Sequence, residues 1–394
     1  MVSFDKALEL VLNGINSSCK VEDVEYFQLL NRVVANDIYA VKNLPSFNNS
    51  AMDGYAFRHS DINKPLKVAK TIYAGDIIEP ILGENECYKI MTGAKVPSDA
   101  DTIAPKELCE VQESIVTVQK ELPKHNALRF AGEEVKQGEV IVKKGEILNA
   151  PKIALLASQG ITSCQVYKKL SIAIVSTGDE LKEPWEKASV NQVYNINAIN
   201  LQMHLKEYGF DGKYLGKIPD SFEQTLDFIS NLKQYDVVIS SGGISKGDKD
   251  YILKALQTQG FQEFFSGINV KPGHPTTIGK IQNTLFIALP GNPLATILNF
   301  ILLGTKAIFK KQGATNFDFK KCTAQNTQKL NLRPTRVNIV LGKTQNGKFT
   351  PYKNNKYGSG MITPLVESNS IAIFNEGVEA VQEGEEIEVI LLEQ

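Results

Sequence analysis

The sequence predicts a multidomain α/β protein: a doubly wound α/β domain with an inserted β domain, a helical and extended first region and a small C-terminal β domain. Three observations support this. The 394 residues exceed what one hydrophobic core usually holds. Between residues 170 and 312, buried-strand runs alternate with helical patterns. Short β-type runs separated by Gly, Pro and Asp occur on both sides of that stretch.

Composition restricts the classes of function. The apolar content of 42% and charged content of 22% are ordinary for a soluble globular protein. A formal net charge of -1 gives no argument for nucleic acid or a membrane surface as partner. The five cysteines show no metal-ligand or redox spacing, so we expect a reducing cytoplasm. Residues 3–12 read as an amphipathic helix rather than a signal peptide, and no apolar run approaches the ~20 residues of a membrane span.

The first half of the chain divides into two predicted regions. Residues 1–43 read as one or two helices with a connector, and residues 44–143 as a β domain with strands near 66–69, 87–91 and 115–118. Asn149 is a plausible N-cap for a helix that has Pro151 in its first turn and Gly160 just past its end. Because this helix looks like a return to the first region, we assign 1–43 and 144–169 together and treat 44–143 as an insertion.

The predicted α/β domain spans residues 170–312. Strands at 171–175, 213–215, 237–239 and 285–289 alternate with helices at 197–208, after Asp220 to about 233, and from 293 to about 309. Three of the strands end in Gly-bearing polar loops, and in such folds the carboxyl ends of the strands form the ligand crevice. We therefore expect these loops to bind substrate through a shared set of residues: Ser176, Thr177, Gly178, Ser241, Gly242, Gly243, Ser245, Pro290 and Asn292.

The loop at residues 240–250 is the stretch that most clearly predicts a ligand site. Its glycines allow the backbone to approach a ligand closely, and successive N–H groups form a concave anion site. Asp248 and Asp250 repel an anion unless a hard cation such as Mg²⁺ lies between them and a phosphate. The alternative is a Gly-rich turn in which Asp caps the next helix.

Two further stretches carry candidate residues. Residues 270–276 place Lys271 and His274 three residues apart on a segment stiffened by two prolines, where a cation would face an oxyanion; a stiff surface connector is the alternative. Residues 313–394 return to a β pattern, read as a small barrel or sandwich, with strands at 336–341, 370–374 and 386–392. The polar loop around Ser359 within it is either part of a site or only a hairpin.

Six ordered motifs resemble the molybdopterin molybdenumtransferase family (MoeA), which includes the E domain of gephyrin. They are SAMDGYA at 50–56, IMTGA at 90–94, STGDEL at 176–181, SSGGIS at 240–245, VKPG at 270–273 and LPGNP at 289–293. The resemblance spans essentially the whole chain. It implies an elongated homodimer, a pterin-binding α/β domain at 170–312 and a C-terminal β barrel at 313–394.

The resemblance also implies a reaction. The family acts on adenylylated molybdopterin and molybdate, cleaves the adenylyl phosphoanhydride in a divalent-cation-dependent step that releases AMP, and places molybdenum on the dithiolene. The active cleft is expected between the α/β domain of one subunit and the inserted β domain of the other. Mg²⁺ is the expected cation, and other proteins of molybdenum cofactor biosynthesis are possible partners.

The motifs assign roles to particular residues. Asp53, Thr92 and Glu180 match positions around the cleft, and Asp220 and Asp250 match acidic positions near the pterin phosphate and the metal. Asp248 is a third candidate metal ligand. Ser245 and Lys271 match the molybdate pocket, which Ser359 and one of Arg333 or Arg336 would complete. Molybdate is a dianion, so lysine, arginine, hydroxyl and backbone N–H groups suit it.

Three positions depart from the family pattern. Glu134 stands where an aspartate is usual, Asn195 replaces a carboxylate, and His274 replaces a second lysine and is largely neutral near pH 7. These changes motivate a first alternative, a binding or scaffold protein that keeps the fold without the chemistry. A second alternative, a nucleotide pyrophosphatase or adenylyltransferase, follows from the α/β domain but leaves the two β domains unexplained.

Overall fold

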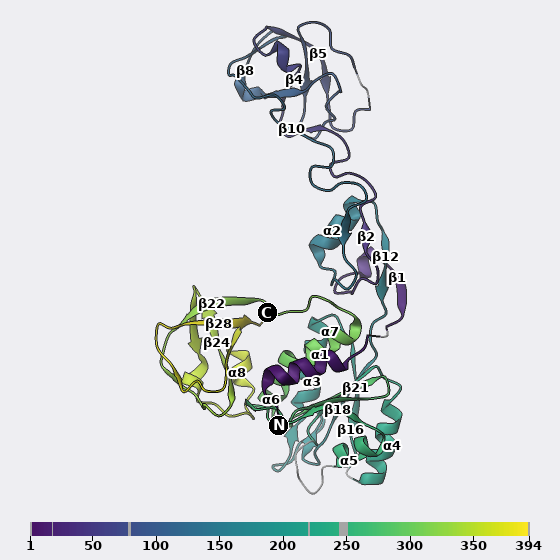
Figure 1. Cartoon of the computed structure of the whole chain (residues 1–394), viewed down its shortest axis with the longest axis vertical. Coiled ribbons are helices and arrows are strands. Elements are labelled where there is room, and N and C mark those ends of the chain that lie inside the picture. The colour runs from purple at the N-terminus through teal and green to yellow at the C-terminus, as the bar shows by residue number, and fades with distance from the viewer. Residues whose placement is uncertain (1, 18, 78–79, 220, 244–250, 393–394) are drawn as a thin grey trace. The chain divides into compact units, whose positions relative to one another are not determined.

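The computed structural model describes residues 2–17, 19–77, 80–219, 221–243 and 251–392. The chain divides into two compact units (Figure 1). Unit 1 comprises residues 1–35, 144–149 and 163–394, and unit 2 comprises residues 36–143 and 150–162. The predicted domain boundaries at 43, 143, 169 and 312 stay predictions.

Unit 1 is built on a six-stranded sheet. Its first four strands are parallel, the fifth runs antiparallel to them, and the sixth pairs antiparallel with the fifth. Its strands, in spatial order, are β16 (Gly212–Lys217), β13 (Ile172–Ser176), β17 (Val237–Ser241), β21 (Thr284–Leu289), β20 (Thr277–Ile281) and β18 (Gln262–Ser266). The predicted α/β architecture is confirmed.

Helices cover both faces of this sheet because successive residues of its central strands point to opposite sides. Ile172 and Ile174 of β13 pack in one core, whereas Ala173 and Val175 pack in the other. The first core takes in α1 (Phe4–Gly14), α3 (Ile196–Glu207), α6 (Pro293–Asn299) and α7 (Thr305–Gln312), and the second takes in α4 (Phe222–Leu232) and α5 (Tyr251–Thr258). In Figure 1, α4 and α5 lie together on the side of the sheet away from α1 and α3.

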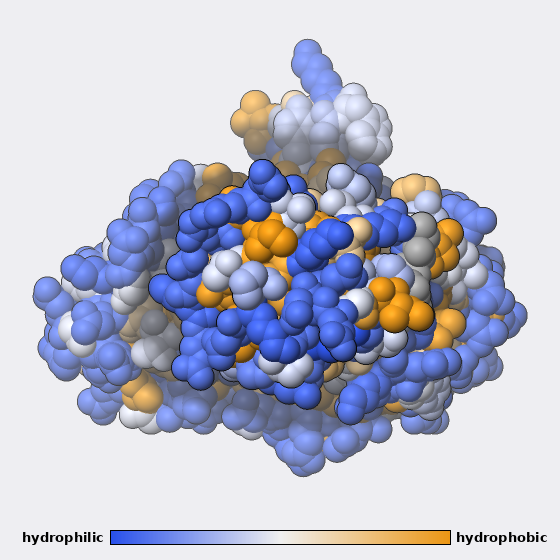
Figure 2. All heavy atoms as spheres, turned by 90° about the horizontal axis from the view of Figure 1, so that it is seen from above, coloured by the Kyte–Doolittle hydropathy of each residue, from blue (hydrophilic) through white to orange (hydrophobic). Residues whose placement is uncertain are grey.

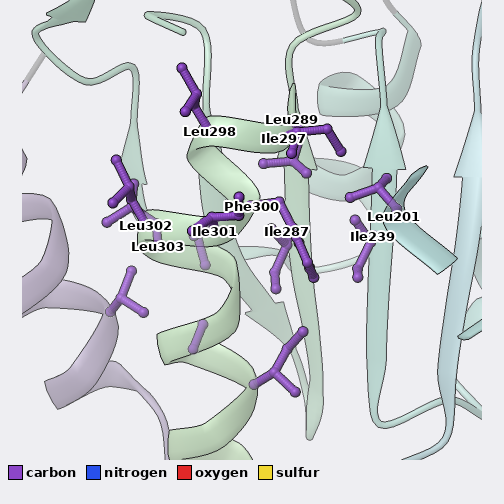
Figure 3. Packing of buried hydrophobic residues seen from close by; sticks show 14 of the residues in the cluster. Leu201, Ile239, Ile287, Leu289, Ile297, Leu298, Phe300, Ile301, Leu302 and Leu303 are labelled. Atoms are coloured by element: carbon purple, nitrogen blue, oxygen red, sulfur yellow. The ribbon is translucent and has the colours of Figure 1, made fainter. Parts of the chain in front are cut away.

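A long apolar helix forms the centre of the first core. Helices α6 and α7 are joined by a π-helical turn, Phe300–Gly304, and Figure 3 shows Ile297 beside Leu289 and Phe300 beside Ile287 of β21. Among the described residues, 293–312 form one helix long and apolar enough to cross a membrane, so the expectation that no apolar run approaches that length is wrong here. Because 83% of its apolar window is buried inside the protein, it is a core helix.

The C-terminal part of unit 1 is a closed five-stranded barrel. Its ring runs β24 (Val337–Gln345), β25 (Lys348–Pro351), β22 (Lys321–Asn326), β28 (Glu386–Leu391) and β26 (Ser370–Phe374), which pairs again with β24. A further strand from the α/β domain, β19 (Val270–Lys271), pairs in parallel with β24. Because of this pairing, the segment that carries Lys271 is part of the barrel's sheet as well as of the α/β domain.

The described part of the first 35 residues contains one α-helix, within the one or two helices predicted for residues 1–43. Only α1 is an α-helix among their described residues, and β1 (Val21–Glu25) pairs antiparallel with β12 (Ser163–Tyr167). Unit 1 also contains short elements: β14 (Leu181–Lys182), β15 (Val193–Tyr194), β23 (Leu330–Asn331), β27 (Ala380–Val381) and α8 (Thr363–Val366).

Unit 2 is mainly β-structure, and its sheet lies within residues 44–143, which were predicted as a β domain. Its six-stranded sheet runs β7 (Thr102–Pro105), β4 (Gly54–Phe57), β6 (Glu86–Ile90), β5 (Leu66–Ile72), β9 (Ile115–Val118) and β8 (Cys109–Gln112). The unit also contains β2 (Ile38–Tyr39), β3 (Asn49–Ser50), β10 (Leu128–Arg129), β11 (Val140–Val142) and helix α2 (Ala150–Ser158).

On the face of the protein shown in Figure 2, apolar residues form small groups separated by hydrophilic ones, which is ordinary for a protein surface.

Candidate active site

A cleft of about 910 Å³ in unit 1 lies at the carboxyl ends of the central strands. The strand register aligns Ser176 with Ser241 and Ser241 with Leu289, so the loops that follow these residues start side by side. The cleft is lined from the α/β domain and from the barrel. Predicted site residues on its wall are Thr177, Glu180, Ser241, Lys271, His274, Pro290, Asn292, Arg336 and Ser359.

The glycines of the central loop are required by close contacts with the neighbouring strand end. Gly242 and Gly243 have φ of +87° and +71°, in the left-handed region that other residues rarely adopt. A Cβ on Gly242 would lie 2.6 Å from Thr177 Oγ1. Gly242, Gly243, Ser176 and Gly178 do not line the cleft, but Gly242 and Gly243 lie close against Thr177 and so bring the two loops together.

Asn197, which sequence reasoning did not select, ties two of the loops together. Its side-chain amide donates to Ser241 Oγ at 2.7 Å and to the carbonyl oxygen of Gly291 at 2.8 Å. The residue is buried at the start of α3 and lines the cleft. A buried asparagine in a helix has no signature in a single sequence, because its role depends on partners far along the chain.

Lys271 and Arg336 make part of the cleft wall cationic, and Arg333 lies near them. Lys271 is half-buried, and both burial and the nearby positive charges of Arg333 and Arg336 lower the pKa of Lys271. No described acidic side chain forms an ion pair with any of these three residues. Arg336 lines the cleft, whereas Arg333 is exposed and does not. Three positive charges without such counter-ions create a site that favours an anion.

The turn that carries Lys271 and His274 is fixed by buried groups. His274 Nδ1–H donates to the carbonyl oxygen of Ile268 at 2.9 Å, which leaves Nε2 for a ligand. Asn299 has no exposed surface and donates to the Gly273 carbonyl oxygen at 2.7 Å. Gly273 has φ of +109°, and a Cβ there would lie 2.2 Å from Asn299 Nδ2. Glycine is therefore needed at position 273.

The loop from the barrel reaches the start of α6. The carbonyl oxygen of Ser359 accepts a hydrogen bond of 3.0 Å from the backbone N–H of Leu294. This contact places the Ser359 segment beside Asn292 and closes the barrel side of the cleft.

Comparison with known proteins agrees with this architecture. Residues 2–160 match the "MoeA N-terminal region (domain I and II)", residues 173–310 the "Probable molybdopterin binding domain" and residues 323–392 the "MoeA C-terminal region (domain IV)". A molybdopterin molybdenumtransferase of Haemophilus influenzae is 32% identical, over 99% of this chain and 98% of its own. The chain belongs to the MoeA family.

Solved structures support the same assignment. A molybdopterin biosynthesis MoeA protein from Pyrococcus horikoshii is 30% identical with a TM-score of 0.78, and the match covers 100% of both chains. A second structure from that organism is 26% identical with a TM-score of 0.85, covering 99% of this chain and 100% of its own. The predicted resemblance is confirmed, and this MoeA-family chain is an enzyme of molybdenum cofactor biosynthesis.

Three predicted residues lie in unit 2. Asp53 Oδ1 accepts hydrogen bonds from the backbone N–H and the hydroxyl of Thr92, at 2.8 and 2.7 Å, and these hold the pKa of Asp53 below its ordinary value. The structure thus brings Asp53 and Thr92 together. Glu134 is exposed, 3.7 Å from Arg129, while the neighbouring Glu133 makes the closer contact of 2.7 Å.

The departure at Asn195 has a structural account. Asn195 is buried and caps α3, where its side-chain oxygen accepts from the Ala198 N–H. Its amide nitrogen lies 3.1 Å from Ser176 Oγ and 2.9 Å from the hydroxyl of Tyr214, which donates to Glu183 at 2.6 Å. Burial raises the pKa of Tyr214. Glu183 therefore supplies a carboxylate next to the position where one is missing.

Four predicted residues, Asp220, Ser245, Asp248 and Asp250, lie outside the described residues. In the part that the structure describes, no group of three or more His, Cys, Asp or Glu side chains is placed to hold a metal ion. Glu180 supplies a carboxylate to the cleft wall. Since Mg²⁺ prefers several oxygen ligands, the described residues alone do not fit a magnesium site.

Proposed function

We propose that this protein inserts molybdenum from molybdate into adenylylated molybdopterin and releases AMP in a divalent-cation-dependent step. The observation that supports it best is the cleft, which joins strand-end loops suited to a phosphorylated ligand to a wall of cations without described counter-ions. A nucleotide-binding α/β domain alone would not need this wall of cations.

The strand-end loops and the cationic wall would bind different substrates. The loops at Thr177 and Ser241 offer hydroxyl and backbone N–H groups for phosphate oxygens. Lys271 and Arg336 would hold molybdate by charge-assisted hydrogen bonds and place it beside the pterin. Holding the two substrates in one cleft lowers the entropic cost of bringing them together.

His274 fits the same role despite the loss of a lysine. With Nδ1–H committed to Ile268, Nε2 can donate to an oxyanion when the ring is protonated. We therefore assign His274 to molybdate binding, together with the Ser359 hydroxyl and the predicted Ser245.

The cation requirement rests on the sequence. Asp220, Asp248 and Asp250 remain the proposed Mg²⁺ ligands, and Mg²⁺ bound there would offset the negative charge of the phosphoanhydride. Asp53, Thr92, Glu134 and Glu180 remain proposed catalytic residues. We also propose a homodimer in the cytoplasm, and sedimentation of the purified protein tests the dimer.

Turnover of adenylylated molybdopterin is the direct test. We expect the purified protein to release AMP only when both molybdate and Mg²⁺ are present. AMP release that is indifferent to molybdate would contradict the proposal. Failure to bind either substrate would favour the scaffold alternative, and turnover of ATP or ordinary dinucleotides would favour the nucleotide-acting one.

A further inference from the structure

The cationic wall poses a physical problem. Lys271, Arg333 and Arg336 repel one another, and no described carboxylate neutralises any of them. Repulsion between like charges favours conformations in which their side chains and the turn at 333–336 move away from Lys271. Something must therefore hold this turn next to Lys271.

Asn338 holds the turn through three hydrogen bonds. Its amide nitrogen donates to the carbonyl oxygens of Arg333 and Arg336, at 2.9 and 2.8 Å, and its side-chain oxygen accepts from the Arg333 N–H at 3.1 Å. The side chain is only 3% exposed and lies on the cleft wall. Asn338 is also the residue paired with Lys271 where β19 meets β24. One residue thus connects all three cations.

The chemistry of this connection requires an amide. An aspartate could accept from the Arg333 N–H, but it could not donate to the two carbonyl oxygens when ionised. Its charge would also pair with Lys271 or the arginines and reduce their attraction for an anion. A neutral amide, which both donates and accepts, makes these hydrogen bonds to the turn and leaves the positive charge of the lysine and the two arginines intact.

We propose that Asn338 is a positioning residue for oxyanion binding, whose buried amide holds the Arg333–Arg336 turn against Lys271 without neutralising it. The proposal rests on the proposed function in that molybdate is the expected anion. It goes beyond the proposed function because it names an uncharged residue that acts through Lys271, Arg333 and Arg336.

The barrel contains a matched control. Asn326 is 1% exposed, and its amide nitrogen donates to two backbone carbonyl oxygens, those of Gln328 and Gln382, at 2.7 and 2.9 Å. It does not line the cleft. Asn326→Ala therefore removes the same kind of buried bonds from the same barrel, and so separates a general loss of stability from a loss of positioning.

The first experiment measures molybdate binding and turnover of the full-length variants. We expect Asn338→Ala to weaken molybdate binding by about 10-fold and Asn338→Asp by about 100-fold. The KM for molybdate should rise while the KM for adenylylated molybdopterin stays within about twofold. Asn326→Ala should leave both constants unchanged. Wild-type molybdate affinity in Asn338→Asp, or an equal loss in Asn326→Ala, would overturn the proposal.

The second measurement does not need an anion. Titration of ¹³C-methylated lysines by NMR, with Lys271→Arg to assign the signal, reports the pKa of Lys271. In Asn338→Ala the arginines are released, so this pKa should rise toward the ordinary lysine value. An unchanged pKa would refute the positioning role even if the enzyme is active. Absence of molybdate binding in the wild type would instead refute the proposed function.

Discussion

Replacement of Lys271 by methionine separates anion binding from stability. Lys271 is a half-buried cation on the cleft wall, next to Arg333 and Arg336 and without a described acidic partner. Methionine has similar length and flexibility but no charge. The variant should keep the fold and lose part of the oxyanion site.

The size of the effect follows from the bond that is lost. A hydrogen bond to a charged group contributes about 1.5–3 kcal/mol, and about 1.4 kcal/mol corresponds to a tenfold change. Molybdate binding should therefore weaken by about 10- to 150-fold in Lys271→Met. Because Arg336 and His274 remain on the wall, binding should not be abolished.

Stability should change in the opposite direction. The folded-state pKa of Lys271 is lowered, first by burial and then by the two arginines. The unfolded chain therefore binds the proton more readily, and near pH 7 the protonated lysine costs stability. That cost decreases as pH rises through the folded pKa toward the unfolded value of 10.5. Lys271→Met should unfold at a higher urea concentration than the wild type at pH 7. The difference between the two urea midpoints should become smaller at higher pH.

Two assays check this account. Calorimetric titration with molybdate measures affinity, and urea unfolding at several pH values measures stability. A variant that binds molybdate as tightly as the wild type would refute the assignment of the cationic wall. A variant that is less stable at pH 7 would refute the claim that Lys271 is held there at a cost.

Three further predictions follow from the structure and the proposed roles. Gly273→Ala should lower the free energy of unfolding by about 1–3 kcal/mol in urea melts, because φ of +109° and the Asn299 side chain exclude a Cβ; an unchanged midpoint would contradict this. Asp53→Asn should lower AMP release by about 100-fold while Thr92 keeps its acceptor and the melting temperature stays the same; full activity would remove Asp53 from the mechanism. EDTA should abolish AMP release and added Mg²⁺ restore it, with release in EDTA contradicting the cation requirement.

Local patterns in the sequence predicted the α/β domain well. The strands that end at Ser176, Ser241 and Leu289 are short apolar runs followed by Gly-bearing loops, and the structure aligns their ends at one edge. Such features depend on neighbouring residues, so one sequence is enough to find them.

Features that depend on distant pairing were missed. Strand β1 pairs with β12, about 140 residues later, and no strand was predicted within residues 1–43 because the pairing depends on that distant segment. Spacing alone also left Arg333 and Arg336 equivalent, because only the folded cleft shows that Arg336 lies on its wall and Arg333 does not. The supporting asparagines Asn197 and Asn338 are polar residues whose roles come from their buried partners.

A crystal structure with molybdate, phased at the molybdenum absorption edge, tests the central claim most directly. We predict an anomalous peak on the cleft wall, within hydrogen-bond reach of Lys271 and Arg336 and next to His274 and Ser359. A peak elsewhere in the chain, or none in crystals of an enzyme that turns over with molybdate, would contradict the account.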